Sequence, residues 1–111
     1  MKIKKVEIPL YYGELIIVKA KNWKEVNKKF GTNAEKGFEA VFFKDDKKSG
    51  RTRYVVAYVG KKLSNDVIAH ETVHVVNNIF IDRKMEIDPY NDEPQAYLTG
   101  WVFNQIQKFT K

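Results

Sequence analysis

The chain has 111 residues, a mass of 13.0 kDa and a formal net charge of +6 at neutral pH. This is the length of one ordinary domain, so we expect a single domain over residues 1–111 rather than two. A hydrophobic content of 43% is enough to bury a core and argues against a disordered chain. The sequence has no cysteine, which excludes disulfides and thiolate metal sites and leaves His, Asp and Glu as strong ligands.

The charge is divided unevenly along the chain. Residues 1–62 hold 16 Lys and Arg against 7 Asp and Glu, a net charge of +9, whereas residues 63–111 hold 4 against 7, a net charge of −3. A basic segment is compatible with nucleic-acid binding, because Lys and Arg neutralise phosphates, but lysines that keep the exposed face of a sheet soluble are the more common explanation. Both histidines lie in the acidic segment, where a cation is expected to bind.

The first residues of the chain contain no long apolar run. Lys and Glu are mixed among the apolar residues of MKIKKVEIPLYYGELIIV, unlike a signal peptide or a membrane-spanning helix. We therefore expect a soluble cytoplasmic protein with no membrane association.

The basic segment is predicted to form most of a β-sheet. Four stretches are rich in β-branched and aromatic residues, namely Lys2–Pro9, Tyr11–Ala20, Gly37–Lys44 and Arg51–Val59. Between the second and the third, Asn22–Phe30 has the spacing of a short amphipathic helix, with Trp23, Val26 and Phe30 on one side. The polar stretch Lys44–Gly50 predicts the turn of an antiparallel hairpin.

The acidic segment is predicted to begin with a helix. Ser64 is a good N-cap, and Leu63 before it is placed to pack on Ile68 in the first turns. The helix is expected to run to about Asp82. It is apolar on nearly all sides, which is typical of a helix buried in the middle of a domain.

A loop over residues 83–90 is expected to lead to a second helix, from about residue 91 or 92 to Lys108, with Pro94 tolerated in its first turn. Three aromatic residues near the end of this helix are predicted to join the core, namely Trp101, Phe103 and Phe109. The sequence therefore predicts an α+β fold. A small antiparallel, or mixed, sheet of about four strands packs on the buried helix and on the C-terminal helix.

The first of these helices contains the motif HETVH at residues 70–74. At 3.6 residues per turn His70 and His74 lie on one face, with Cβ atoms about 5–6 Å apart, so their imidazoles can bind one ion. Glu71 points to the side, from where its carboxylate can reach a water on the metal, as a general base in hydrolysis does. The alternative is two histidines buried for packing, but such a crowded pair is hard to satisfy without a shared cation.

A hydrolytic zinc needs three protein ligands and an open position for water. Because there is no third histidine, the candidates are downstream carboxylates, namely Asp82, Glu86, Asp88, Asp92 and Glu93. Glu93 is favoured because Ala96 and Gly100 continue its side of the second helix, and a stripe of small residues lets two helices approach closely. A glutamate in the first turn is also favourable against the helix dipole without any metal. Asp92, the expected N-cap, is the next choice.

These motifs resemble the gluzincin group of zinc metallopeptidases, in which the third zinc ligand is a glutamate on the helix after HExxH. The matching residues are HETVH at 70–74 and Glu93 within NDEPQAYLTGW. Glu93, Ala96 and Tyr97 also match a Glu-x-x-Ala-Tyr pattern of small metallopeptidases, many of them encoded by phages or prophages. The resemblance spans about residues 51–107 and implies a minimal zincin-like fold, with a twisted sheet above the active-site helix.

The resemblance also implies roles for individual residues. His70, His74 and Glu93 would be the ligands of Zn²⁺, and Glu71 would be the catalytic base. Tyr97 stands where fuller gluzincins often have an Asp that orients a ligand histidine. Those enzymes also have a downstream His or Tyr that stabilises the oxyanion, and since no His follows here, the role falls to Tyr90 or Tyr97.

The function implied is zinc-dependent hydrolysis of a peptide or protein substrate by a metal-activated water. An extended substrate is expected to pair with a strand edge, either at residues 51–59 or on the neighbouring strand. One alternative is a non-catalytic, zinc-stabilised interaction module of the phage or prophage type. Another is a nucleic-acid-binding protein that uses Trp23, Tyr54 and Tyr58 as stacking groups. The sequence does not indicate an oligomeric state.

Overall fold

Four strands form one mixed sheet in the computed structural model, which describes residues 1–35, 37–45 and 51–111. The elements in chain order are β1 (Lys2–Glu7), β2 (Glu14–Ala20), α1 (Trp23–Phe30), β3 (Ala40–Lys44), β4 (Arg53–Val59), α2 (Asn65–Asp82) and α3 (Glu93–Thr110). The strand order is β1-β2-β4-β3; β2 and β4 are parallel, and each outer strand is antiparallel to its neighbour. The predicted α+β fold is confirmed, and the sheet is mixed rather than purely antiparallel.

The two central strands are buried on both faces of the sheet. In β2, Leu15 and Ile17 join the core on one face, whereas Ile16 and Val18 join the core on the other. β4 behaves in the same way, with every residue from Tyr54 to Tyr58 buried. A strand covered on both sides reads as a continuous apolar run, and that explains why these two segments lack the alternation of a half-exposed strand.

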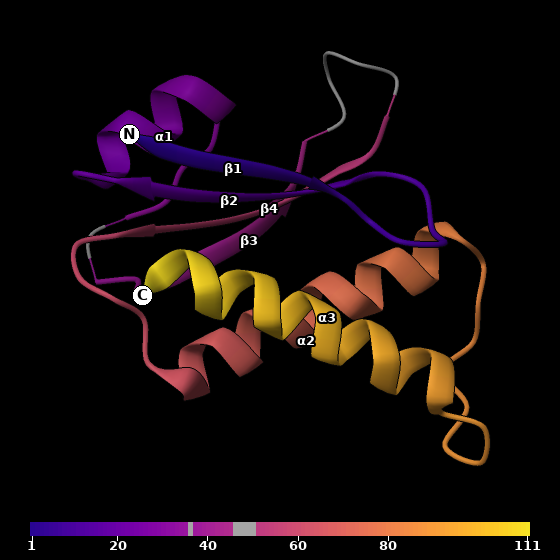
Figure 1. Ribbon diagram of the computed structural model, residues 1–111. Coiled ribbons are helices and arrows are strands. Elements are labelled where there is room, and N and C mark those ends of the chain that lie inside the picture. Colours follow the sequence, from indigo (N-terminus) through magenta and orange to yellow (C-terminus); the bar gives the residue numbers. More distant parts are fainter. Residues whose placement is uncertain (36, 46–50) are drawn as a thin grey trace.

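Helices cover the sheet unequally. Figure 1 shows α1 on one face and the pair α2 and α3 on the other. α1 begins where the Asn22 side chain accepts a hydrogen bond from the backbone N–H of Glu25, 2.9 Å away. It ends at Gly31, whose φ of 68° is in the left-handed region that glycine adopts without strain. The predicted burial of Trp23 and Val26 is confirmed.

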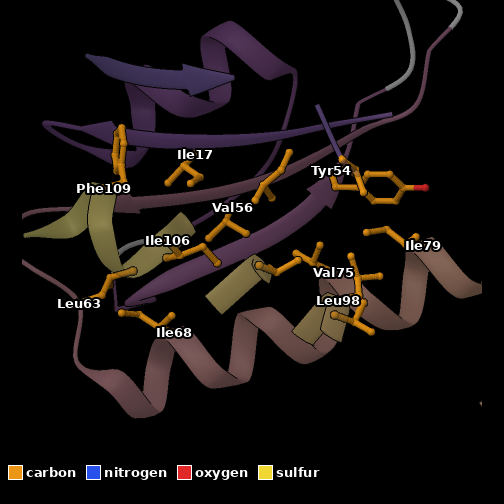
Figure 2. Close-up of a cluster of buried hydrophobic side chains, with 14 of the residues drawn as sticks. Ile17, Tyr54, Val56, Leu63, Ile68, Val75, Ile79, Leu98, Ile106 and Phe109 are labelled. Carbon is orange, nitrogen blue, oxygen red and sulfur yellow. The ribbon is translucent and has the colours of Figure 1, made fainter. Parts of the chain in front are cut away.

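The start of α2 is fixed by apolar contacts and by α3. Leu63 and Ile68 belong to the same core cluster, which agrees with the predicted staple (Figure 2). The backbone N–H of Leu63 also donates to Thr110 Oγ1, 2.9 Å away, so the beginning of α2 is tied to the end of α3. Ser64 is the N-cap by backbone conformation, but its side chain makes no capping hydrogen bond.

The expectation that α2 is buried on nearly all sides is wrong. Its exposed residues include three apolar ones and both histidines, namely Ala69, His70, Val73, His74 and Ile81. The reason is that α2 and α3 form a single layer, so each helix has one face on the sheet and one face outward (Figure 1). The outward face of α2 carries both histidines, and this exposes them to ions in solution.

The C-terminal helix agrees with its prediction and is slightly longer. It runs to Thr110 rather than Lys108. Phe109 is in the core (Figure 2). Trp101 and Phe103 are partly buried and pack against this core, as expected. The hairpin between β3 and β4 is confirmed by their antiparallel register, although most of the predicted turn, residues 46–50, lies outside the described residues.

Two findings bear on the alternative functions. Trp23, Tyr54 and Tyr58, the stacking groups of the nucleic-acid hypothesis, are all buried, so their rings cannot stack on bases. Within the described ranges, none of the helices combines the length and the apolarity needed to cross a membrane.

A buried tyrosine ties the end of α2 to the sheet. The Tyr54 hydroxyl on β4 donates to Asp82 Oδ2 at 2.6 Å, and Lys44 Nζ on β3 donates to Asp82 Oδ1 at 3.0 Å. Burial, together with the hydrogen bond to Asp82, raises the pKa of Tyr54. Burial also acts to raise the pKa of Asp82, but the hydrogen bonds from Tyr54 and Lys44 and the charges of Lys44 and Arg83 outweigh it, so the pKa is lowered.

We predict that Tyr54→Phe lowers the free energy of unfolding by about 1–3 kcal/mol, because a buried hydrogen bond to a charged acceptor is lost while the ring keeps its packing. Urea denaturation at pH 7 measures the change. Tyr12→Phe is the matched control, since Tyr12 is exposed, and we expect a change within about 0.5 kcal/mol. Equal losses in both variants would contradict the role assigned to the Asp82 contact.

We also predict a pH-dependent part of the stability that Asp82→Asn removes. Because the folded-state pKa of Asp82 lies below its ordinary value of about 3.9, the carboxylate stabilises the fold above that pH. This contribution is lost as the pH falls toward the lower folded-state pKa. The difference in unfolding free energy between wild type and Asp82→Asn should therefore be largest near neutral pH and shrink below about pH 4. A difference that is constant from pH 7 to pH 3 would contradict it.

Candidate metal site

The exposed face of α2 brings two imidazoles together. His70 and His74 are one helical turn apart, and their Nε2 atoms are 3.1 Å from each other. The ring centroids are 4.8 Å apart and the rings are nearly perpendicular, at 76°. Two nitrogens that each bind a tetrahedral zinc at 2.0–2.1 Å lie about 3.3 Å apart, so the observed separation fits a shared cation.

Glu71 lies beside the two histidines but points inward. Its residue is 4% exposed, and Oε2 is sealed from water with no hydrogen-bond partner in the described chain. Burial raises the pKa of this carboxyl, and the neighbouring His74 and His70 act in the opposite direction. A buried carboxylate oxygen without a partner is costly, so it indicates a group that receives a proton or a cation from outside the chain.

These three residues fit a divalent cation. One ligand atom from each of His70, Glu71 and His74 lies within 4.8 Å of the other two. Imidazole nitrogen and carboxylate oxygen are the donors that zinc accepts when thiolates are absent.

A groove adjoins the site on the side of the sheet edge. It has a volume of about 270 Å³, and Glu71 and His74 line it together with residues of β3 and the segment before it. The ring of Phe42 on β3 stacks on His74, with centroids 6.2 Å apart and planes at 18°. β3 is an end strand, so its outer edge has no pairing strand among the described residues. The site therefore opens beside a free strand edge.

The predicted third ligand is not part of this group. Glu93 is the first residue of α3 and is exposed, and within the described ranges the only such group of three or more ligand residues is His70, Glu71 and His74. Asp82 is engaged by Tyr54 and Lys44. Three further candidates are exposed without joining the group, namely Glu86, Asp88 and Asp92. The assignment of Glu93 stays a prediction.

The argument that led to Glu93 from helix packing is wrong. Ala96 and Gly100 are exposed, and a Cβ atom added to Gly100 would have nothing within 4 Å. α3 packs on α2 through its other face, with Leu98 and Val102 in the core. The stripe of small residues therefore faces outward and does not bring Glu93 to the imidazoles.

The two tyrosines proposed for the oxyanion are on the surface. Tyr90 is 99% exposed and Tyr97 is 75% exposed. Their roles in stabilising an oxyanion stay predictions. Sequence reasoning did not identify Phe42, because only the fold brings β3 beside α2, and no local pattern indicates that contact.

Comparisons with models of protein families, with curated proteins and with solved structures found no match for this chain. The resemblance to gluzincins therefore depends on HETVH and the Glu-x-x-Ala-Tyr residues alone. The argument for a metal rests on the site's own geometry.

We predict that the protein binds one zinc per chain and that His70→Ala and His74→Ala each weaken this binding by more than 100-fold. A ligand contributes more than the outer partners of a metal site, whose loss costs about 10–100-fold. Competition with a chromophoric chelator measures the affinity. Asn78→Ala is the control on the same helix, and it should bind zinc as wild type does. Unchanged affinity in both histidine variants would contradict the site.

Proposed function

We propose that the protein is a zinc-dependent peptidase that uses α2 as its active-site helix. The observation that supports this most is the buried, unpartnered carboxylate oxygen of Glu71 beside two convergent, exposed imidazoles. A helix selected only for packing gains nothing from a carboxylate at this position. A hydrolase gains a proton acceptor there.

The roles of the residues follow from their positions. His70 and His74, whose Nε2 atoms are 3.1 Å apart, would hold the ion. When bound, zinc supplies a Lewis acid that polarises a carbonyl and lowers the pKa of water to about 7. The Glu71 carboxylate would accept a proton from the attacking water and pass it to the leaving amine, and burial, which raises the pKa of this carboxyl, favours the protonated form between the two transfers.

The strand edge supports a peptide as the substrate. β3 forms one side of the groove that Glu71 and His74 line, and its outer edge lacks a partner strand within the described part of the chain. An extended peptide can add to such an edge through its backbone, which places its carbonyls in line with the groove. Of the two expected sites for the substrate, residues 51–59 and the neighbouring strand, we therefore favour the neighbouring strand, β3.

A specific observation favours a second candidate, a zinc-stabilised interaction module that cuts nothing. Glu71 is itself one of the three residues whose ligand atoms lie within 4.8 Å of one another, and Glu93 is not. If Glu71 takes a coordination position, no base remains for hydrolysis. Zinc would then raise the thermal stability by mass action without any catalysis.

Glu71→Gln separates the two functions. For the peptidase we expect zinc affinity within about threefold of wild type, and a fall in kcat of about 10²–10⁴-fold on a quenched-fluorescence peptide library. Glu35→Gln, at an exposed glutamate outside the site, is the matched control and should keep full activity. Loss of zinc affinity in Glu71→Gln, with no hydrolysis by wild type, would support the interaction module instead.

Glu93→Ala tests the third ligand in the same assays. The peptidase proposal expects loss of zinc and of activity together, because a hydrolytic zinc needs three protein ligands. Asp92→Ala tests the next choice. Full retention of zinc and activity in both variants would remove α3 from the site.

A further inference from the structure

The face of the sheet opposite the metal site is only partly covered. α1 has 8 residues and is therefore about 12 Å long, whereas the 7 residues of β2 extend over about 23 Å. Figure 1 shows α1 over one end of the sheet, near the N-terminus. Beyond the end of α1 lies a cavity of about 420 Å³, larger than the groove at the metal site.

The floor of this cavity is apolar. Ile3 from β1, Ile16 from β2 and Phe30 from the end of α1 line it. All three also pack on the core cluster between α1 and the sheet. The core on which these three residues pack therefore holds them in place. The cavity above them stays uncovered because α1 ends at Gly31.

The rim of the cavity is cationic. Lys5, Lys29 and Arg53 line it, and among the described residues Asp45 is the one acid that lines it with them. Arg53 donates from Nε to the Asp45 backbone oxygen at 3.1 Å and from Nη2 to the Asp45 carboxylate, which leaves Nη1 available. Lys5 and Lys29 have no carboxylate partner among the described residues. Glu14 pairs with Arg53 in the strand register but does not line the cavity.

The strand register explains how these groups meet. Lys5 lies directly opposite Ile16 in the antiparallel pair β1 and β2. Arg53 is two residues before Val55, which pairs with Ile16, so Lys5, Ile16 and Arg53 share one face of the sheet. The cations therefore stand on either side of an apolar floor, and the uncompensated charge faces the cavity.

We propose that this cavity is a second binding site, for a small anionic molecule with an apolar body. Its carboxylate or phosphate group contacts Lys5, Lys29 and Arg53, and its hydrocarbon part lies on Ile3, Ile16 and Phe30. The volume is within the range of small-molecule sites, and few polar groups over an apolar lining are typical of them. The site is independent of the metal, which is expected on the other face of the sheet.

Calorimetric titration of the full-length chain with naphthoate and with its neutral analogue naphthamide tests the proposal. EDTA is included so that the carboxylate cannot bind a metal at α2. We expect naphthoate to bind at least tenfold more tightly than naphthamide. Lys5→Gln and Lys29→Gln should each weaken naphthoate binding by about two- to fivefold, the value of one partly exposed charge contact. Lys28→Gln, which changes the same charge on α1 outside the cavity, should change it less than twofold.

Amide chemical shifts locate the ligand. Binding in the cavity should shift the signals of Ile16, Phe30 and Gly31, while those of His70 and His74 stay unchanged. Equal binding of naphthoate and naphthamide would overturn the proposal, and so would inorganic phosphate binding as tightly as naphthoate. Binding of a single-stranded oligonucleotide that Lys28→Gln and Lys29→Gln weaken equally, with no naphthoate binding, would indicate a dispersed basic surface instead. Thermal melting of each variant verifies that it is folded.

Discussion

The parallel pairing of β2 and β4 is the constraint on which the rest of the structure depends. Both strands carry apolar side chains on both faces, so neither face of the sheet centre can be left to water. Two long helices supply the cover on one face and one short helix supplies it on the other. The two long helices carry the candidate metal site on their exposed side, and the short helix leaves the cavity beside it uncovered.

The position of α2 under the sheet determines what its motif can do. One end of the helix is held by Asp82, which receives hydrogen bonds from β4 and β3, and the other end by Leu63 and the contact with Thr110. With both ends fixed, the rotation of the helix is fixed as well. Glu71 is then buried while His70 and His74 are exposed, and the His74 ring stacks on Phe42 of the edge strand β3.

Local patterns predicted the local features of this protein. The strands, the three helices and the pairing of His70 with His74 depend on the period of the backbone, which the sequence displays directly. The errors arose where a feature depends on packing at a distance. α2 is apolar on most sides, yet one face is exposed, because apolar composition does not reveal how many layers a fold has. Gly100 likewise suggested a close helix contact, but the face on which a glycine lies is decided by the core residues around it, here Leu98 and Val102.

The identity of the third ligand decides whether Glu71 is free to act as the catalytic base. If zinc is held by His70, His74 and Glu71, it has three protein ligands, but Glu71 is then no longer available as the base. A zinc that receives its third donor elsewhere leaves Glu71 free. The burial of Glu71 favours the second arrangement, because Oε2 is sealed from water on the inner side of α2 while the imidazoles are exposed on the outer side. Glu71 lies between the buried and the exposed side of α2, so its carboxylate can take a proton from the exposed side. Burial raises the pKa of this carboxyl and so favours keeping the proton there. The burial of this one side chain is therefore the observation that supports the proposed hydrolase most, and the proposal requires that a residue other than Glu71 completes the metal site.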